Sequence, residues 1–346
     1  MRENNVHTPL IQQMNAAIES QSSPMCSREI YPGAHQIVSR FGDRWLFQYL
    51  FVGEIVVLLD TGIHTTPVTA IFPYMEKLGL APRRLTLALT LHADLDHQGG
   101  NFVLRDASSA TLLACHRADR ALIENPEKLY ARRLNHLARR WGAGMPRDYL
   151  AYAGRPAAIQ VAFSGGERLR LGPDWQLEIW HVPGHSQGHL AVYDARHRAA
   201  FTSDAVQALG CPTISGGLAF APTYYAVGAY LSTIHFLEQM PIEHLYTGHW
   251  PEAHGAQVSE FLAASRGFVE RVEEWLPRIL RAHPRGATLN EIIAAIAPRL
   301  GDWPRAQDTM LQWALHGHLV RLRQRGLVQA DKNAPARWFW QDNAQR

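Results

Sequence analysis

The chain has 346 residues, of which 47% are hydrophobic and 19% are charged. This length suits one large domain with a smaller appendage, and the composition is that of an ordinary globular protein with a sizeable core. The formal net charge of +3 gives no general case for nucleic-acid binding.

Three widely separated cysteines, Cys26, Cys115 and Cys211, form no CxxC pair. The sequence therefore predicts neither a disulfide framework nor a thiolate zinc site, and it favours a reducing, cytoplasmic setting. No apolar run is long enough to span a membrane, and the first residues lack the basic-then-apolar pattern of a leader peptide. We expect neither secretion nor membrane insertion.

We expect residues 1–29 to form an N-terminal extension, followed by closely spaced antiparallel strands in HQIVSRF, RWLFQYLFV and EIVVLLDTG. The last of these runs ends in Asp60, where the strand gives way to a polar loop. Asp60 is a candidate catalytic residue that would orient a metal ligand or a water molecule. An ordinary turn carboxylate is an equally good interpretation.

Residues 66–80 have the pattern of a helix, and Leu85 to Leu91 that of a buried strand. Four polar side chains follow this strand within six positions: His92, Asp94, Asp96 and His97. Burying these side chains at a strand end without partners would cost free energy. Imidazole nitrogens and carboxylate oxygens together are good metal ligands, so a bound metal ion would provide the partners. A solvated loop in which Asp96 caps the next helix is the alternative.

The strand-and-helix rhythm continues through TLLACH at 111–116 and indicates a layered α/β core. Residues 117–160 break the rhythm and are predicted to be a helical insertion over one end of the sheet. Their arginines, Arg132, Arg133, Arg139 and Arg140, could attract an acidic substrate. A solvated helix face is the preferred interpretation.

Three later strand ends carry residues of the same kind. WQLEIWHVPGHSQGH places His185 in a glycine-containing loop, with His189 as a supporting residue; AAFTSDAV ends near Asp204, and EHLYTGHW ends near His249. Polar residues at successive strand ends are how a layered sheet assembles a site. The candidate metal ligands are therefore His92, Asp94, Asp96, His97, His185, Asp204 and His249.

In order and spacing, HADLDH, VPGHSQGH, FTSDAV and YTGHW resemble the motifs of metallo-β-lactamase superfamily hydrolases. Across residues 30–255, the resemblance implies a four-layer αββα sandwich with a binuclear site. It implies that His92, Asp94 and His185 hold the first ion. Asp96, with an additional catalytic role, would hold the second ion together with His97 and His249, and Asp204 would bridge the two.

Asp94 departs from the pattern, because most of the superfamily has histidine there. An anionic oxygen ligand lowers the net charge of the first position, so iron or manganese become alternatives to the two zinc ions that we expect. Flavodiiron proteins also carry a carboxylate at this position, but this chain shows no flavodoxin domain. A hydrolytic dehalogenase branch is a further family alternative.

The carboxyl-terminal part begins with a periodic helix at 256–284 that should pack on the sandwich. Residues 285–346 then resemble a small winged-helix tail of two helices and two strands. Its arginines, Arg321, Arg323 and Arg325, invite a nucleic-acid interpretation. A solvated face is preferred, with the tail framing the active site or a homodimer contact.

These patterns predict a metal-dependent hydrolase that acts on a small ester, thioester or lactone through an activated water molecule. An iron-dependent oxidoreductase or dioxygenase of the same fold is the alternative. Tyr224, Tyr225 and Trp250 could line the substrate pocket or belong to the core. Fold alone does not select the substrate.

Overall fold

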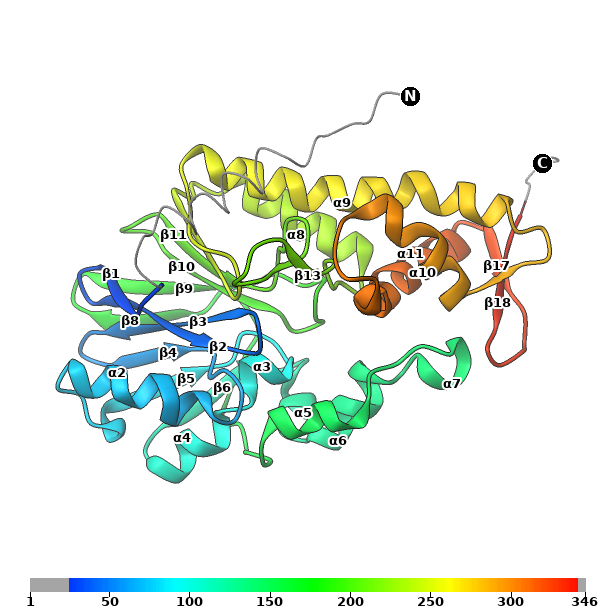
Figure 1. Ribbon diagram of the computed structural model, residues 1–346. Coiled ribbons are helices and arrows are strands. Elements are labelled where there is room, and N and C mark those ends of the chain that lie inside the picture. The colour runs from blue at the N-terminus through cyan, green and yellow to red at the C-terminus, as the bar shows by residue number, and fades with distance from the viewer. Residues whose placement is uncertain (1–24, 342–346) are drawn as a thin grey trace.

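Two β-sheets face each other in the computed structural model, which describes residues 25–341 (Figure 1). The first sheet has seven strands in chain order, antiparallel from β1 to β4 and parallel from β4 to β7. Its strands are β1 (Arg28–Tyr31), β2 (Ala34–Arg40), β3 (Trp45–Val52), β4 (Val56–Leu59), β5 (Leu85–Leu89), β6 (Leu112–His116) and β7 (Val161–Phe163).

The second sheet has six strands in the order β15-β14-β11-β10-β9-β8. Only the β11–β14 pair is parallel in this sheet. Its strands are β8 (Arg168–Gly172), β9 (Trp175–His181), β10 (Leu190–Asp194), β11 (Ala199–Ser203), β14 (His244–Thr247) and β15 (Ala253–His254).

One hydrophobic cluster fills the space between the sheets. Phe51 and Leu59 of the first sheet and Ile179 and Phe201 of the second are fully buried in it. The rings of Phe51 and Phe201 meet edge to face with centroids 5.0 Å apart. Both faces of each sheet are covered, which explains why β3, β4, β10 and β11 are almost continuously apolar.

Helices cover the outer faces, with α2 and α4 below the first sheet and α8 and α9 above the second (Figure 1). The expected αββα sandwich is therefore confirmed. Its helices are η1 (Pro67–Ile71), α2 (Phe72–Lys77), η2 (Pro82–Arg84), α3 (Leu95–Gln98), α4 (Asn101–Ala107), α8 (Val227–Gln239) and α9 (Ala256–Arg281). Two short strands, β12 (Cys211–Pro212) and β13 (Leu218–Phe220), pair with each other.

The sequence pattern did not indicate α8. Ala226 precedes this helix and Met240 follows it, so neither end carries a side chain that stops or starts a helix. The predicted extension at residues 1–29 lies mostly outside the described residues. Its last part forms β1, which begins at Arg28.

The 117–160 segment consists of short helices: α5 (Arg120–Ile123), α6 (Pro126–Leu129), η3 (Tyr130–Leu134), α7 (Ala138–Trp141) and η4 (Arg147–Ala153). Of these, η3 is a π-helix. Such turns are rare and often occur at functional sites. Short helices thus make up most of the segment.

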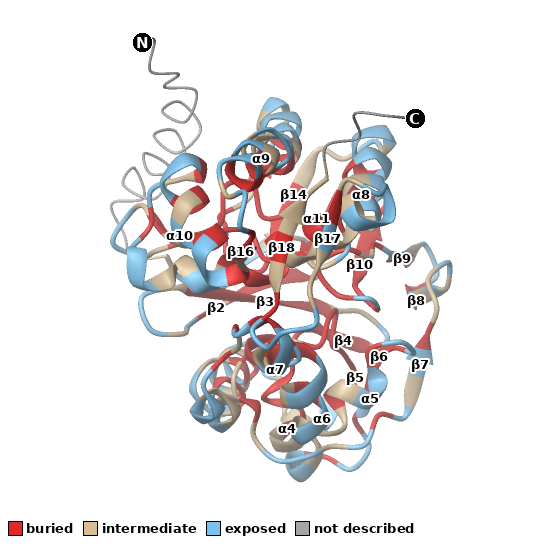
Figure 2. Ribbon diagram, turned by 90° about the vertical axis from the view of Figure 1, so that its right-hand side faces the viewer, coloured by how far each residue is buried: buried red, intermediate tan, exposed pale blue. Residues whose placement is uncertain are grey.

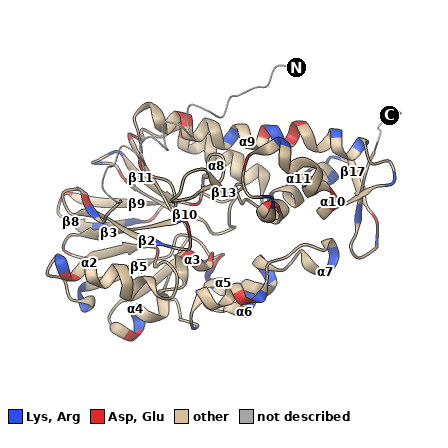
Figure 3. Cartoon of the chain, viewed as in Figure 1, with Lys and Arg blue, Asp and Glu red and all other residues tan. Residues whose placement is uncertain are grey.

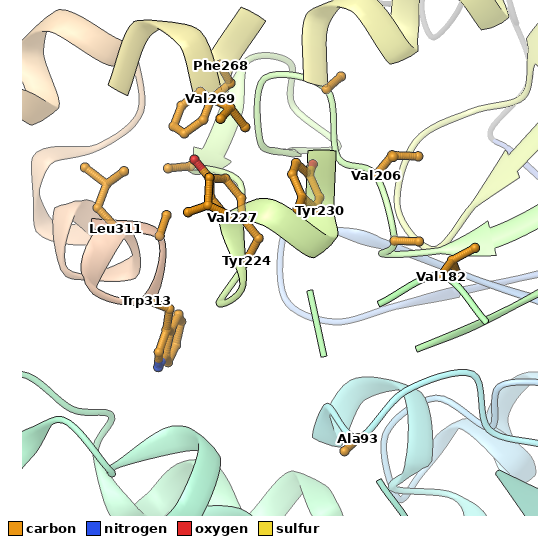
Figure 4. Close-up of a cluster of buried hydrophobic side chains, with 14 of the residues drawn as sticks. Ala93, Val182, Val206, Tyr224, Val227, Tyr230, Phe268, Val269, Leu311 and Trp313 are labelled. Atoms are coloured by element: carbon orange, nitrogen blue, oxygen red, sulfur yellow. The ribbon is translucent and has the colours of Figure 1, made fainter. Parts of the chain in front are cut away.

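The tail contains α10 (Leu289–Leu300), η5 (Arg305–Leu311), α11 (Gln312–Gln324) and a three-stranded sheet of β16 (Ala287–Thr288), β18 (Arg337–Trp340) and β17 (Val328–Ala330). Figure 4 shows Tyr224, Val227, Phe268 and Leu311 lying together where α8, α9 and the tail meet. These side chains belong to the same buried cluster as the core under the helices. The tail is thus part of the main hydrophobic core.

The buried residues follow the strands and the inner sides of the helices, while the outward sides of α8 and α9 are exposed (Figure 2). Acidic and basic residues are interspersed along α9 (Figure 3). In the tail, Arg321 pairs with Glu273 of α9, and Arg323 lies over the ring of Trp338. Among residues 25–341, no helix is long and apolar enough to cross a membrane.

Candidate metal centre

The residues expected to bind metal come together at one edge of the sandwich. His92 lies just after β5, Asp96 and His97 lie in α3, His185 follows β9, and the loops after β11 and β14 carry Asp204 and His249. Of the seven candidate ligands, all except Asp94 are almost fully buried. Strand ends far apart in sequence therefore supply one site.

Four side chains, Asp96, His97, Asp204 and His249, form what we call the aspartate-rich cluster. His97 Nε2 is 3.7 Å from Asp204 Oδ2 and 3.9 Å from Asp96 Oδ1. His249 Nε2 is 3.4 Å from Asp204 Oδ2 and 3.8 Å from Asp96 Oδ2. Ligand atoms around a tetrahedral zinc ion, with bonds of about 2.0–2.2 Å, lie about 3.4 Å apart.

These distances are longer than those of ordinary hydrogen bonds. They therefore suit ligand atoms arranged around a central cation better than directly bonded side chains. His97 Nε2 is also buried with no hydrogen-bond partner among the described residues. Such an atom calls for an explanation, and a bound ion supplies one. The aspartate-rich cluster therefore fits a divalent metal ion.

The cluster strongly perturbs its own titrating groups. Burial alone would lower the pKa of His97, but the carboxylates of Asp204, Asp60 and Asp96 raise it to about 9. Burial likewise opposes protonation of His249, whose pKa is nevertheless raised well above its usual range by Cys211 and Asp204. The site is thus built to hold positive charge.

Asp60 lies directly behind this cluster. His97 Nδ1 donates to Asp60 Oδ2 at 2.9 Å, Ser203 Oγ donates to the same oxygen at 2.7 Å, and Leu91 N donates to Oδ1 at 2.8 Å. Asp60 and Ser203 both have positive φ, at 57° and 46°. Strained backbone held by several hydrogen bonds is typical of functional sites. The bond to Asp60 leaves His97 Nε2 free to face the cluster.

A second group contains His92, Asp94 and His185, which we expected to bind the first ion. His185 Nε2 lies 2.8 Å and His92 Nε2 lies 3.5 Å from Asp94 Oδ2. An unexpected side chain, Arg133 of η3, joins them. Its Nε donates to Asp94 Oδ1 and its Nη2 donates to Asp94 Oδ2 at 2.8 Å.

The interpretation of the 117–160 arginines as a solvated face is correct for Arg132, Arg139 and Arg140, which are exposed, and wrong for Arg133. Arg133 is 5% exposed. Burial would raise the pKa of Asp94, but the charge and hydrogen bonds of Arg133 hold it well below the usual range. No local sequence signal distinguishes Arg133 from the exposed arginines beside it.

The loop that carries His185 is fixed by close packing. Gly184 has φ of 141°, and a Cβ there would lie 2.5 Å from Tyr230 Cα in α8, so only glycine fits. His185 Nδ1 donates to the carbonyl of Thr223. The Nε2 atom of His189 is 3.1 Å from the carbonyl of Thr202, which suits the supporting role that we predicted for it.

A cavity opens above the aspartate-rich cluster. Asp96, Asp204 and His249 line its base, with Arg44 beside them. Its wall is mainly apolar and combines three parts of the chain: Phe41 and Phe220 from the sandwich, Leu134 and Met145 from the insertion, and Met310 and Trp313 from the tail. Tyr225 also lines the cavity, whereas Tyr224 and Trp250 are core residues.

The fold and this site together define the class of protein. The chain belongs to the metallo-beta-lactamase superfamily, whose family model matches residues 45–249. This match includes all seven candidate ligands and Arg133.

Two curated relatives match shorter segments. A hydroxyacylglutathione hydrolase from Cereibacter sphaeroides is 28% identical over 145 residues, which cover 42% of this chain and 43% of that protein. An acyl-coenzyme A thioesterase from Gallus gallus is 33% identical over 131 residues, which cover 37% and 44%. The matched segments span less than half the length of these relatives.

Two solved structures share the fold at greater length. A metallo-beta-lactamase family protein from Thermus thermophilus aligns over 90% of this chain and 100% of its own, with a TM-score of 0.67 and 18% identity. A beta-lactamase domain protein from Burkholderia ambifaria aligns over 93% and 96%, with a TM-score of 0.69 and 17% identity. The shared fold therefore extends beyond residues 45–249.

Proposed function

We propose that the protein is a metal-dependent hydrolase that cleaves acyl thioesters of a small thiol carrier. The observation that carries this proposal is the aspartate-rich cluster at the base of an apolar cavity. Asp96, His97, Asp204 and His249 would hold the ion. Two imidazole nitrogens and two carboxylate oxygens suit zinc, and also iron or manganese.

A divalent ion held there supplies Lewis-acid activation of water and of the substrate carbonyl. The chain supplies the positioning. Asp96 projects into the cavity and would orient the attacking water, while Asp60 fixes the ring of His97 from behind. Arg44 lies 3.9 Å from Asp96 and over the ring of Phe41, so its charge is held beside the base of the cavity.

The groups that line the cavity favour a thiol as leaving group. Apart from the expected metal ligands, the titratable side chains in its described lining are Arg44, Tyr149 and Tyr225. Burial raises the pKa of Tyr225, which makes it a poor acid. A thiol, with a pKa of about 8.5, departs as its anion without a proton donor, whereas the amine of a β-lactam needs one.

The shape and the relatives support the same substrate class. The cavity has a volume of about 80 Å³. That space suits a short acyl group whose carrier stays outside. Both curated relatives are named for removing acyl groups from thiols, glutathione in one case and coenzyme A in the other.

The test is a substrate panel assayed with the zinc, manganese and iron forms of the full chain. S-acyl glutathiones and acyl-coenzyme A esters should be hydrolysed with higher kcat/KM than matched oxygen esters, lactones, phosphodiesters and β-lactams. Asp96→Asn should lower kcat/KM by about 10²–10³-fold, because it weakens a metal ligand and removes the water-orienting carboxylate. Asp106→Asn, which changes an exposed carboxylate in α4, is the control.

Two results would contradict the proposal. One is selective hydrolysis of lactones or β-lactams with no thioesterase activity. The other is stoichiometric oxygen consumption by the iron form with a thiol substrate, which would identify an oxidoreductase.

A further inference from the structure

The position expected for the first metal ion already contains a fixed cation. The Arg133 guanidinium binds both oxygens of Asp94 and reaches His185 twice, with Nη1 donating to the backbone carbonyl at 3.1 Å and Nη2 lying 3.1 Å from Nε2. These are the atoms that a metal ion at this position would need. Within residues 25–341, His92 and His185 form a group with His189 that could hold an ion, and His92 Nε2 has no hydrogen-bond partner, whereas Asp94 belongs to no such group. The guanidinium that binds Asp94 and His185 therefore decides whether this position can take an ion.

The tautomer of His185 sharpens this conflict. Its Nδ1 faces the Thr223 carbonyl, which can only accept, so Nδ1 carries a proton and Nε2 is the atom left for a metal ion. Nε2 also lies 2.8 Å from Asp94 Oδ2, to which it donates when it is protonated. Arg133 Nη2 lies 3.1 Å from that atom and can donate to it. Whether Nε2 donates to Asp94 or accepts from Arg133, it has no free lone pair for a metal ion.

Contacts at both the side chain and the backbone hold Arg133 in this position. Its guanidinium lies 4.5 Å from the ring centroid of Tyr225, whose hydroxyl donates to the Arg133 carbonyl at 3.3 Å. The side chain is 5% exposed and comes from the π-helix η3. Because both ends of the residue are held, moving it aside for a metal ion would break several contacts at once.

The charges of the region agree. Two guanidiniums and four carboxylates lie at the two expected metal positions: Arg44 and Arg133, and Asp60, Asp94, Asp96 and Asp204. With neutral imidazoles, this set lacks two positive charges. A single divalent ion supplies both, and a second ion at His92, Asp94 and His185 would lie beside the like charge of the Arg133 guanidinium.

We propose that Arg133 takes the place of the first metal ion and that the protein binds one divalent ion, at Asp96, His97, Asp204 and His249. This inference rests on the metal binding of the proposed function but not on its substrate. In this arrangement Asp94 is the counter-ion of an arginine. That accounts for an aspartate at a position where the superfamily pattern has histidine.

The test counts ions and does not use activity. The full chain is stripped with a chelator and titrated with Co²⁺, which is followed by its visible absorption and by elemental analysis after gel filtration. The wild-type protein should saturate at one ion per chain. His92→Ala should still bind one ion, with affinity unchanged within about threefold, whereas His249→Ala should lose about 100-fold or more in affinity.

Arg133→Met removes the charge with little change in length, and the variant should bind a second ion. Arg139→Met, an exposed arginine of the same insertion, should remain at one. The counts for the wild type and His92→Ala do not depend on whether Arg133→Met folds. Two ions in the wild-type protein, or the loss of the bound ion in His92→Ala, would overturn this inference but not the proposed function. A wild-type protein that binds no ion would overturn both.

Discussion

Asp60→Asn is the most informative change at the metal centre, because it alters one atom and preserves the backbone. Asparagine tolerates the positive φ of this position almost as well as aspartate does. Its Oδ1 can still accept from Leu91 N. Its amide nitrogen, however, replaces the oxygen that accepts from His97 Nδ1 and Ser203 Oγ.

The size of the effect follows from the tautomer of His97. An amide N–H facing Nδ1 favours the ring form whose proton is on Nε2, the atom that must bind the ion. Losing a supporting carboxylate of this kind costs about 10- to 100-fold in metal affinity, or about 1.4–2.7 kcal/mol. We expect kcat/KM at limiting metal to fall in parallel.

The assay is competition for Zn²⁺ with a chromophoric chelator. Asp194→Asn is a matched control, because Asp194 is also buried and accepts from a histidine Nδ1 and from Trp175 Nε1. Asp194 is the last residue of β10, whereas the metal centre lies near the first residue of that strand. The reasoning fails if Asp60→Asn binds zinc as the wild type does, or if the control weakens binding equally.

Three further predictions concern the site, the tail and the cavity. Gly248→Ala should lower bound metal, measured by elemental analysis, at least tenfold, because its Cβ would lie 2.7 Å from Asp204 Oδ1. Gly228→Ala in α8, where a Cβ meets nothing, should keep the metal and stabilise the fold by about 0.5–1 kcal/mol. Burial lowers the pKa of His318 from 6.5 to about 3, so the unfolded chain takes up the proton first as pH falls. The stability is complete above pH 6.5, and roughly 2–3 kcal/mol should be lost by pH 4.5 in denaturant titrations; an equal loss in His318→Gln would contradict this. Met310→Trp should lower kcat/KM at least tenfold for the longest acyl groups that the wild-type cavity accepts and spare the shortest, and a uniform loss across chain lengths would rule out a role in selection.

Much of the fold could be predicted because the strands and helices of the sandwich have recognisable local sequence patterns. Strands buried on both faces, such as β3 and β11, are apolar runs ended by turn residues, and helices such as α9 show a clear period. The residues of the aspartate-rich cluster were identifiable because they follow such runs directly. Helix α8 lacked a boundary signal and was missed.

Arg133 could not be placed from the sequence for a physical reason. Its partners, Asp94 and His185, are 39 and 52 positions away, and only the folded insertion brings them together. A buried arginine and an exposed one have the same local pattern when the neighbours that bury it are distant. The tail residues that line the cavity were hidden in the same way.

Different parts of the chain bind the metal ion and line the wall of the cavity that contacts the substrate. The aspartate-rich cluster is anchored at strand ends of the sandwich, while Met310 and Trp313 enter from a tail that touches none of those four side chains through any hydrogen bond or ion pair recorded among residues 25–341. Exchange of the tail between relatives could therefore transplant substrate choice and leave the hydrolytic centre intact. Diversity within this family would then accumulate at the wall faster than at the base.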